Sequence, residues 1–301
     1  MGRASTGDRA MRGLARIRTF GSLVAFPHTV FAIPFAASAV VLSLAVPHAA
    51  LTAWRIAGML GAMVFARTSA MAFNRWADRD VDAQNPRTRG RHIPAGIVLP
   101  GEALVLAIVS GIGFLVAAAT LGHWPAVLAP AVLLVLLGYS YAKRFTWGAH
   151  AWLGVALSLA PGGAWLAMGA RPGPGILLLM LGVVTWLVGF DVLYSLQDEA
   201  FDRQAGLRSI PARFGARRAL GVSAGSHLVT VLAFTACGIA LHRGLAYAVG
   251  VATCAALLAY EQGLVRRRGL SAIDRAFFDV NAWVSVGFFA LVVVDEIVRR
   301  S

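Results

Sequence analysis

The chain has 301 residues, of which 58% are apolar and 14% charged, and its mean hydropathy is +0.70. Its 27 basic and 14 acidic residues are mostly clustered and cannot coat a water-soluble protein of this length. The composition therefore excludes a soluble enzyme and predicts an all-α integral membrane protein. The formal net charge of +13 does not indicate nucleic-acid binding, because the arginines lie between apolar runs rather than along one basic face.

Apolar runs follow one another along the whole chain, at lengths that suit a hydrocarbon core roughly 30 Å thick. Nine membrane spans are expected, at 20–46, 54–82, 102–121, 125–141, 150–169, 174–200, 218–241, 244–265 and 277–298. With the N-terminus in the cytoplasm, 21 of the 27 basic residues fall on the cytoplasmic side. The positive-inside rule thus predicts a multi-pass protein of the inner or plasma membrane with a cytoplasmic N-terminus.

An internal repeat links the second and sixth spans. Asp78 and Asp82 are followed by RHIPA (91–95), and Asp198 and Asp202 are followed by RSIPA (208–212). An even number of spans separates the two motifs, so both face the cytoplasm. We expect two pseudo-repeated four-helix units plus one helix, arranged around a central cavity.

The expected organisation is a single membrane domain, 1–301. A basic cytoplasmic N-terminus, 1–19, precedes the first span, and two cytoplasmic loops follow the aspartate motifs at 83–101 and 203–217.

Acidic residues concentrate in the two repeated stretches. Each stretch places its polar residues on one helical face, formed by Asn74, Asp78 and Asp82 and by Asp191, Tyr194, Asp198 and Asp202. Paired carboxylates at helix ends suit Mg²⁺, which takes its remaining ligands from water and phosphate. One such pair could be a solvated helix end, but two at matching places in a repeat predict a metal site formed by Asp78, Asp82, Asp198 and Asp202.

Basic residues on the same side complete the predicted site. Arg67 lies inside the second span, seven residues before Asn74, where a charged side chain is costly and therefore marks function. Lys143 and Arg144 end the fourth span and are expected to bind a diphosphate, with Tyr139 one turn earlier. Carboxylates, metal and cations at a membrane surface fit a diphosphate ester with a hydrophobic tail. Such a site stabilises the departing pyrophosphate while an electron-rich ring captures the allylic carbon.

The chain resembles the UbiA superfamily of intramembrane prenyltransferases along nearly its full length. The resemblance is carried by four blocks, NRWADRDVD (74–82), NPRTRGRHIPAG (85–96), YSYAKRFT (139–146) and GFDVLYSLQDEAFD (189–202) with GLRSIPARFG (206–215). It implies nine helices around a cavity and two Mg²⁺ ions under a cap formed by the loops 83–101 and 203–217. The same resemblance implies that Asn74 and the four aspartates bind metal and diphosphate, as do Lys143 and Arg144. It assigns Arg67 to the diphosphate or an acceptor carboxylate, and it places Asp191 and Tyr194 near the reacting centre.

Within that superfamily the blocks are most similar to the 4-hydroxybenzoate polyprenyltransferases and to their relatives in the futalosine route to menaquinone. Arg75 replaces an aspartate of the commoner first motif, which favours the futalosine type with its dihydroxynaphthoate acceptor. The expected partners are a polyprenyl diphosphate, an aromatic acid and the lipid bilayer. The alternatives are a UbiA-type enzyme with a different acceptor and a membrane transporter. Carriers also combine repeats with intramembrane charge, although their repeats are more often inverted.

Overall fold

The computed structural model describes residues 19–23, 32–273 and 276–301, and this part of the chain contains helices and no β-strand. The long helices are α2 (Ala32–Ser43), α3 (Ala53–Ala77), α5 (Pro100–Ala119), α6 (His123–Phe145), α7 (Ala149–Ala167), α8 (Pro174–Ser195), α10 (Ile210–Ala240), α11 (Leu245–Arg268) and α13 (Asn281–Arg300). The short ones are α4 (Arg79–Gln84), η2 (Leu196–Asp198), α9 (Glu199–Gln204), η3 (Gly269–Ala272) and the π-helix η4 (Ala276–Val280). The prediction of an all-α protein is confirmed.

Seven helices in the described part of the chain are long and apolar enough to cross a membrane. They are α3, α5, α6, α10, α11, and the continuous runs Pro174–Gln204 and Ala276–Arg300. The remaining two predicted spans correspond to α2, an apolar helix of 12 described residues, and to α7. A multi-pass membrane protein is therefore supported, while nine crossings stay a prediction. Residues 1–18 of the predicted basic N-terminus and residues 24–31 of the first span lie outside the described ranges.

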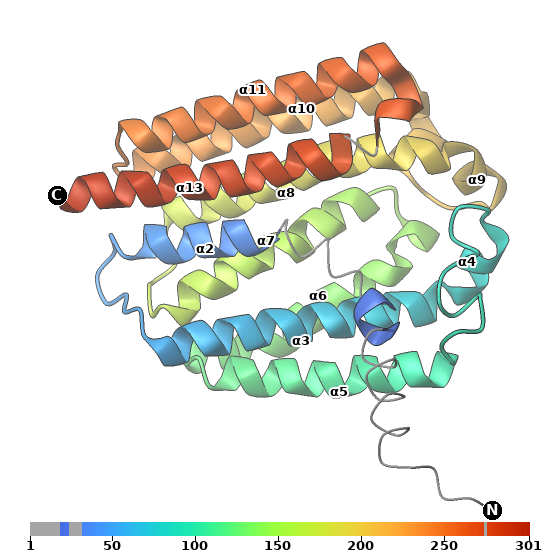
Figure 1. Cartoon of the computed structure of the whole chain (residues 1–301), viewed down its shortest axis with the longest axis horizontal. Helices are drawn as coiled ribbons and strands as arrows, with labels where there is room; N and C mark the ends of the chain where they lie inside the picture. The colour runs from blue at the N-terminus through green and yellow to red at the C-terminus, as the bar shows by residue number, and fades with distance from the viewer. Residues whose placement is uncertain (1–18, 24–31, 274–275) are drawn as a thin grey trace, which may run out of the picture.

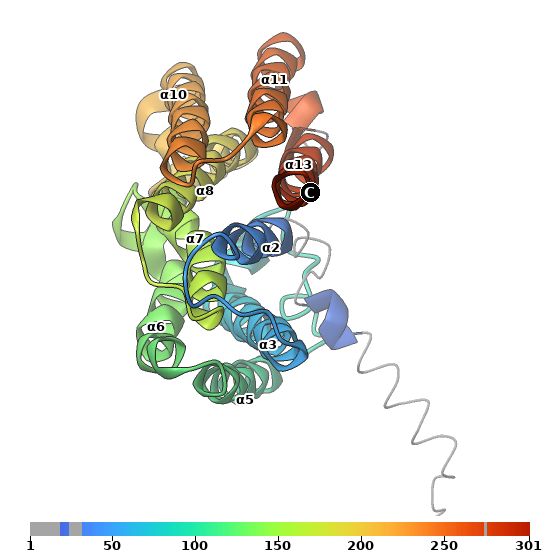
Figure 2. The same cartoon turned by 90° about the vertical axis from the view of Figure 1, so that its left-hand side faces the viewer.

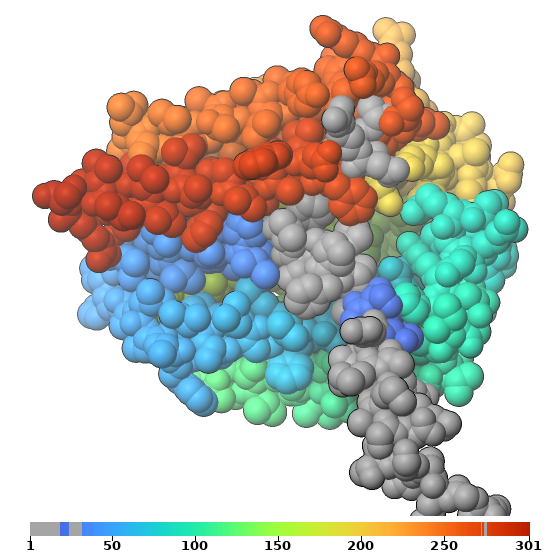
Figure 3. Space-filling view, viewed as in Figure 1, coloured from blue at the N-terminus to red at the C-terminus, as the bar shows by residue number. Residues whose placement is uncertain are grey.

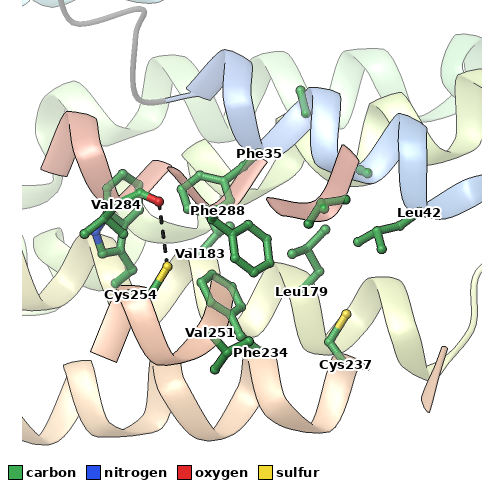
Figure 4. Close-up of a cluster of buried hydrophobic side chains, with 14 of the residues drawn as sticks. Phe35, Leu42, Leu179, Val183, Phe234, Cys237, Val251, Cys254, Val284 and Phe288 are labelled. Atoms are coloured by element: carbon green, nitrogen blue, oxygen red, sulfur yellow. Dashed lines mark hydrogen bonds between the residues drawn. The ribbon is translucent and has the colours of Figure 1, made fainter. Parts of the chain in front are cut away.

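Aromatic side chains of α2, α10 and α13 meet in the main hydrophobic core (Figure 4). The ring of Phe35 on α2 lies 5.7 Å from that of Phe234 on α10 and 5.8 Å from that of Phe288 on α13. Cys254 on α11 is buried beside them, and its Sγ–H donates to the carbonyl oxygen of Val284 at 3.7 Å. This core joins the N-terminal α2 to the C-terminal helices, which holds the two halves of the bundle together.

The two halves use the same packing. Helix α3 packs mainly against α5, and the corresponding helix α8 packs mainly against α10. Helices α8 and α10 approach closely because Gly182 and Gly189 leave room for Phe234 and His227, which any Cβ at the glycines would strike. Seen end-on in Figure 2, α2 and α7 lie between the α3–α5–α6 group and the α8–α10–α11–α13 group.

Both aspartate motifs interrupt a helix in the same way. Helix α3 ends at Asp78, whose φ and ψ are −95° and 4°, and α4 continues from Arg79. In the second repeat Asp198 has φ and ψ of −99° and 1° between η2 and α9. Each motif is thus a break followed by one short helix, rather than the single continuous helix that the residue spacing predicts.

The segments after the two motifs differ from each other. Residues 85–99, within the segment 83–101 predicted as the first cap loop, form turns and bends before α5. The second segment, 203–217, is not a loop throughout, because α10 begins at Ile210 and continues through a kink at Gly215 with φ of 77°. Ser209 starts this helix by accepting a hydrogen bond from the backbone N–H of Ala212 at 3.3 Å.

Helices α4 and α9 lie side by side at one end of the bundle, and the C-terminus lies at the opposite end (Figure 1). On the face shown in Figure 3, α2 lies between α13 and α3, and the segment that follows α4 covers the end of the molecule. The fold therefore brings the two motifs, 120 residues apart in the chain, to the same end.

Candidate active site

A cavity of about 200 Å³ lies at the end of the bundle that carries both motifs. Ten of the eleven residues predicted for the site line it: Asn74, Asp78, Asp82, Tyr139, Lys143, Arg144, Asp191, Tyr194, Asp198 and Asp202. They come from α3, α4, α6, α8, η2 and α9. The structure thus brings both aspartate motifs and the C-terminal end of α6 to one cavity, as the sequence predicts.

The carboxylates of the first motif each face a cation. Arg91 directs its Nη1 at both oxygens of Asp82, at 2.7 and 2.9 Å. Arg144 on α6 donates from Nη2 to Asp78 Oδ1 at 3.2 Å and to the carbonyl oxygen of Ala77 at 2.6 Å. Asn74 donates to the other oxygen of Asp78 at 2.8 Å. Burial raises the pKa of the Asp78 carboxyl above its ordinary value, although the Arg144 and Asn74 hydrogen bonds oppose that rise.

The carboxylates of the second motif are also paired. Arg87 binds Asp198 through two hydrogen bonds, and Lys143 Nζ lies 3.1 Å from Asp202 Oδ2. Asp198 and Asp202 are 7% and 2% exposed, so neither could remain charged there without a partner. Burial lowers the pKa of Arg87, but the hydrogen bonds to Asp198 outweigh it, and the pKa lies above the ordinary value.

The loop after α4 presents Arg87 to the second motif for local reasons. Asn85 precedes a proline and takes an extended backbone conformation, which ends α4. Its Oδ1 accepts a hydrogen bond from the backbone N–H of Arg87 at 2.9 Å, a turn typical of asparagine. Thr88 closes the turn by donating to the carbonyl oxygen of Asp82 at 3.1 Å. The sequence NPRT thus folds into a turn that aims its arginine into the cavity.

The arginines that open the two RxIPA segments differ in role. Arg91 lines the cavity and holds Asp82, whereas Arg208 does not line it. The backbone N–H of Arg208 donates to the carbonyl oxygen of Lys143 at 2.7 Å, and its Nη1 donates to that of Phe145 at 2.6 Å. Arg208 therefore fastens the second segment to the end of α6, next to the predicted diphosphate ligands.

Asp191 and Tyr194 line the cavity from α8. His150 on α7 is 1% exposed, and its Nδ1 lies 2.6 Å from Asp191 Oδ2. Tyr194 accepts a hydrogen bond from Arg87 Nη1 at 3.3 Å, and its ring lies 4.3 Å from that of Phe277. A carboxylate and a phenol thus share the cavity with the four ion pairs.

Comparison with known proteins identifies this arrangement. The model of the UbiA prenyltransferase family matches residues 30–289. The chain belongs to the UbiA prenyltransferase family. It is therefore a prenyltransferase, which confirms the expectation drawn from the sequence blocks and argues against the transporter.

Relatives with curated names agree with this family. The 4-hydroxybenzoate octaprenyltransferase of Aromatoleum aromaticum is 32% identical over 237 residues, covering 78% of this chain and 79% of the relative. The enzyme of the same name from Nitrosomonas europaea is 28% identical over 236 residues, covering 78% and 80%.

Solved structures share the fold. The apo structure of a UbiA homolog from Aeropyrum pernix K1 is 32% identical, has a TM-score of 0.80, and is matched over 89% of this chain and 98% of its own. A UbiA homolog from Archaeoglobus fulgidus, bound to GPP and Mg²⁺, is 19% identical with a TM-score of 0.68, over 91% and 99%.

Arg67 is the one predicted site residue that does not line the cavity of this prenyltransferase. It lies in α3, about two helical turns from Asn74, and its Nε is buried. A role for Arg67, at the diphosphate or at an acceptor carboxylate, stays a prediction.

Several lining residues were not singled out from the sequence of this UbiA member. The block NPRTRGRHIPAG (85–96) contains four such residues, Asn85, Arg87, Thr88 and Arg91. The positive-inside rule alone accounts for the arginines of this block in the sequence. Their signal was present, because two arginines flanking a buried turn after an acidic helix end need partners. His150 gave no comparable signal, since a single histidine at the start of an apolar run is most often a packing residue.

The donor set of this prenyltransferase fits a hard divalent cation. The four carboxylates of the two motifs and the Asn74 amide line one cavity, together with Asp191, and oxygen ligands of this kind are those that Mg²⁺ takes. Within the described residues no three Asp, Glu, His or Cys side chains are grouped closely enough to hold a metal, because each aspartate turns toward its own cation. The residues present therefore suit metal binding only together with an anion that draws the cations away.

Proposed function

We propose that this prenyltransferase transfers a polyprenyl group from a prenyl diphosphate to an aromatic hydroxy-carboxylate in quinone biosynthesis, with Mg²⁺ as cofactor. The observation that carries the proposal is the interleaving of four carboxylates with four cations around one cavity. Such a set can separate into an acidic half that binds metal and a basic half that binds diphosphate. Metal alone would leave the four cations without an anionic partner, and diphosphate alone would leave the four carboxylates without a cation.

The proposed metal residues are Asp78, Asp82, Asp198 and Asp202. Bound Mg²⁺ neutralises charge on the diphosphate and so makes it a better leaving group. Lys143 and Arg144 are proposed to hold the diphosphate, together with Arg87 and Arg91 once these leave their aspartates. Asn74 orients Asp78 through its hydrogen bond to Oδ2.

The reacting carbon is proposed to face Asp191 and Tyr194. Loss of diphosphate from the allylic carbon generates a cation that water would quench, so the site must keep water out. Tyr139, Tyr194 and Phe201 provide aromatic surface in the cavity wall. An electron-rich hydroxyaryl ring then attacks the allylic carbon, and its carboxylate is proposed to bind Arg67.

The acceptor is proposed as a 4-hydroxybenzoate or dihydroxynaphthoate type. The names of the curated relatives support the benzoate. Arg75 in the first motif favours the naphthoate. Both are hydroxyaryl carboxylates, and one chemistry serves both.

The orientation proposed for the protein is an N-terminus and active site in the cytoplasm. It is supported by the charge distribution between the apolar segments, and it gives Mg²⁺ access to the end of the bundle where α4 and α9 lie.

The test is an assay on membranes that contain the protein, with Mg²⁺ and one long prenyl diphosphate. 4-Hydroxybenzoate and 1,4-dihydroxy-6-naphthoate are offered separately, and product masses are measured. A prenylated benzoate or a prenylated naphthoate, lost on addition of EDTA, supports the proposal and names the acceptor. Absence of both products in Mg²⁺ contradicts it.

A further inference from the structure

His150 and Asp191 form a buried pair beside the ion-paired aspartates. His150 lies in the first turn of α7, and Asp191 lies on α8, where its side chain is 18% exposed. Their 2.6 Å contact is among the shortest polar contacts around the cavity. The roles proposed above for metal and diphosphate binding make no use of His150.

The tautomer of His150 follows from its two hydrogen-bond partners, Ile210 and Asp191. The backbone N–H of Ile210 points at His150 Nε2, at 3.4 Å, so that nitrogen accepts and carries no proton. The proton is then on Nδ1, which donates it to Asp191 Oδ2. In this tautomer the Nδ1–Oδ2 hydrogen bond fixes the orientation of the Asp191 carboxyl group.

Asp191 has its second oxygen free for chemistry. Among the described residues no hydrogen bond reaches Asp191 Oδ1, and the side chain lines the cavity. The other aspartates of the cavity differ, because each pairs with a lysine or an arginine. Among the described residues, Asp191 is therefore the aspartate of the cavity that a histidine holds, and its Oδ1 has no hydrogen-bond partner.

We propose that His150 is a positioning residue that fixes the orientation of the Asp191 carboxylate, so that Asp191 Oδ1 takes the proton released by the aromatic acceptor. This inference rests on the proposed prenyl transfer. The allylic C–O bond breaks and its electron pair leaves with the diphosphate, while a π pair of the ring forms the new C–C bond. The proton on the substituted ring carbon then passes to Asp191, and its bonding pair restores the aromatic ring.

His150 also ties this base to the second cap segment. Ile210 is the first residue of α10 and lies two residues after Arg208. The backbone N–H of Arg208 donates a hydrogen bond to the carbonyl oxygen of Lys143. The orientation of Asp191 is thus set by the same segment that adjoins the predicted diphosphate ligand. The segment 208–210 therefore contacts both Lys143, the proposed diphosphate ligand, and His150, the residue that holds Asp191.

Two variants of His150 separate positioning from packing. H150N retains an N–H near the Nδ1 position, whereas H150L has similar bulk and no donor. We expect H150L to lower kcat about 100-fold with KM for prenyl diphosphate within about threefold, and H150N to stay within about tenfold of wild type. H227N serves as the matched control, because His227 is also buried but its ring contacts Gln262 rather than Asp191.

A double-mutant cycle gives the second readout. If His150 acts only through Asp191, then D191N and D191N/H150L have the same kcat. Thermal unfolding of each variant in detergent reports folding independently of activity. A purely structural histidine would lower stability in H150L, H150N and H227N alike, and its effect on kcat would multiply with that of D191N.

The outcomes are distinct. Near wild-type turnover in H150L, equal loss in H150N and H150L, or multiplying losses in the double mutant each overturn the role of His150 while leaving prenyl transfer intact. A wild-type protein that forms no prenylated acceptor overturns the proposed function, and this inference with it.

Discussion

Arg87 and Asp198 lie 111 residues apart in the chain and form a two-point ion pair, with Nη2 2.6 Å from Oδ2 and Nε 2.9 Å from Oδ1. The pair connects the loop of the first motif to the helix break of the second. Paired N–H donors on a carboxylate are among the stronger polar contacts in proteins. The two repeats are thus held together by the charges that are proposed to separate during catalysis.

The first prediction concerns this pair. R87Q should lower the free energy of unfolding by about 1 kcal/mol in EDTA, because Asp198 keeps only a 3.4 Å contact with Asn85. Mg²⁺ should restore the loss by taking the place of the arginine. Thermal unfolding in detergent, with EDTA or with Mg²⁺, measures both effects. R203Q is the control, since Arg203 belongs to an exposed pair with Glu199 and should change nothing. Equal stability of R87Q and wild type in EDTA would contradict the expectation.

The second prediction concerns the aspartates proposed to bind metal. D78A and D198A should each reduce turnover about 100- to 1,000-fold while the protein stays folded, because the diphosphate charge is left uncompensated. D80A is the matched control: Asp80 lies in the same stretch, is 77% exposed, and does not line the cavity. Activity of all three is compared at saturating substrate and Mg²⁺. Near wild-type turnover in D78A or D198A would remove that residue from the metal assignment.

The third prediction concerns Lys143. K143A should raise KM for the prenyl diphosphate about tenfold or more, because a cation that contacts the diphosphate is lost. KM for the aromatic acceptor should stay close to that of the wild type. Steady-state kinetics with each substrate varied in turn separates the two effects. Unchanged KM and kcat would exclude Lys143 from diphosphate binding.

The fourth prediction concerns Arg67, which lies deeper in α3 than the cavity. R67A should reduce prenylation of acceptors that carry a carboxylate and spare a phenol without one, because the proposed contact is to that carboxylate. Product yields with 4-hydroxybenzoate and a matched phenol provide the comparison. A uniform loss on both acceptors would instead assign Arg67 to the diphosphate.

Local spacing was sufficient to predict most of the site. Asp78 and Asp82, like Asp198 and Asp202, occur at helical intervals before RxIPA, so both motifs can be read without knowing how the chain folds. The apolar runs likewise indicate which segments become helices, because hydrophobic length is a property of neighbouring residues. The breaks at Asp78 and Asp198 were not predictable in this way, since helical spacing continues through both.

The sequence by itself determined that this protein is helical and membrane-embedded. It also determined that the chain contains a repeat in which each copy has a pair of aspartates followed by RxIPA. Only the tertiary structure decided which cation pairs with which carboxylate, that Arg87 reaches Asp198, and that His150 meets Asp191. It also placed Arg67 outside the cavity that its helical face was expected to share. The physical reason is that most of these contacts join residues 41 to 111 positions apart, so their partners are chosen by helix packing rather than by any local pattern.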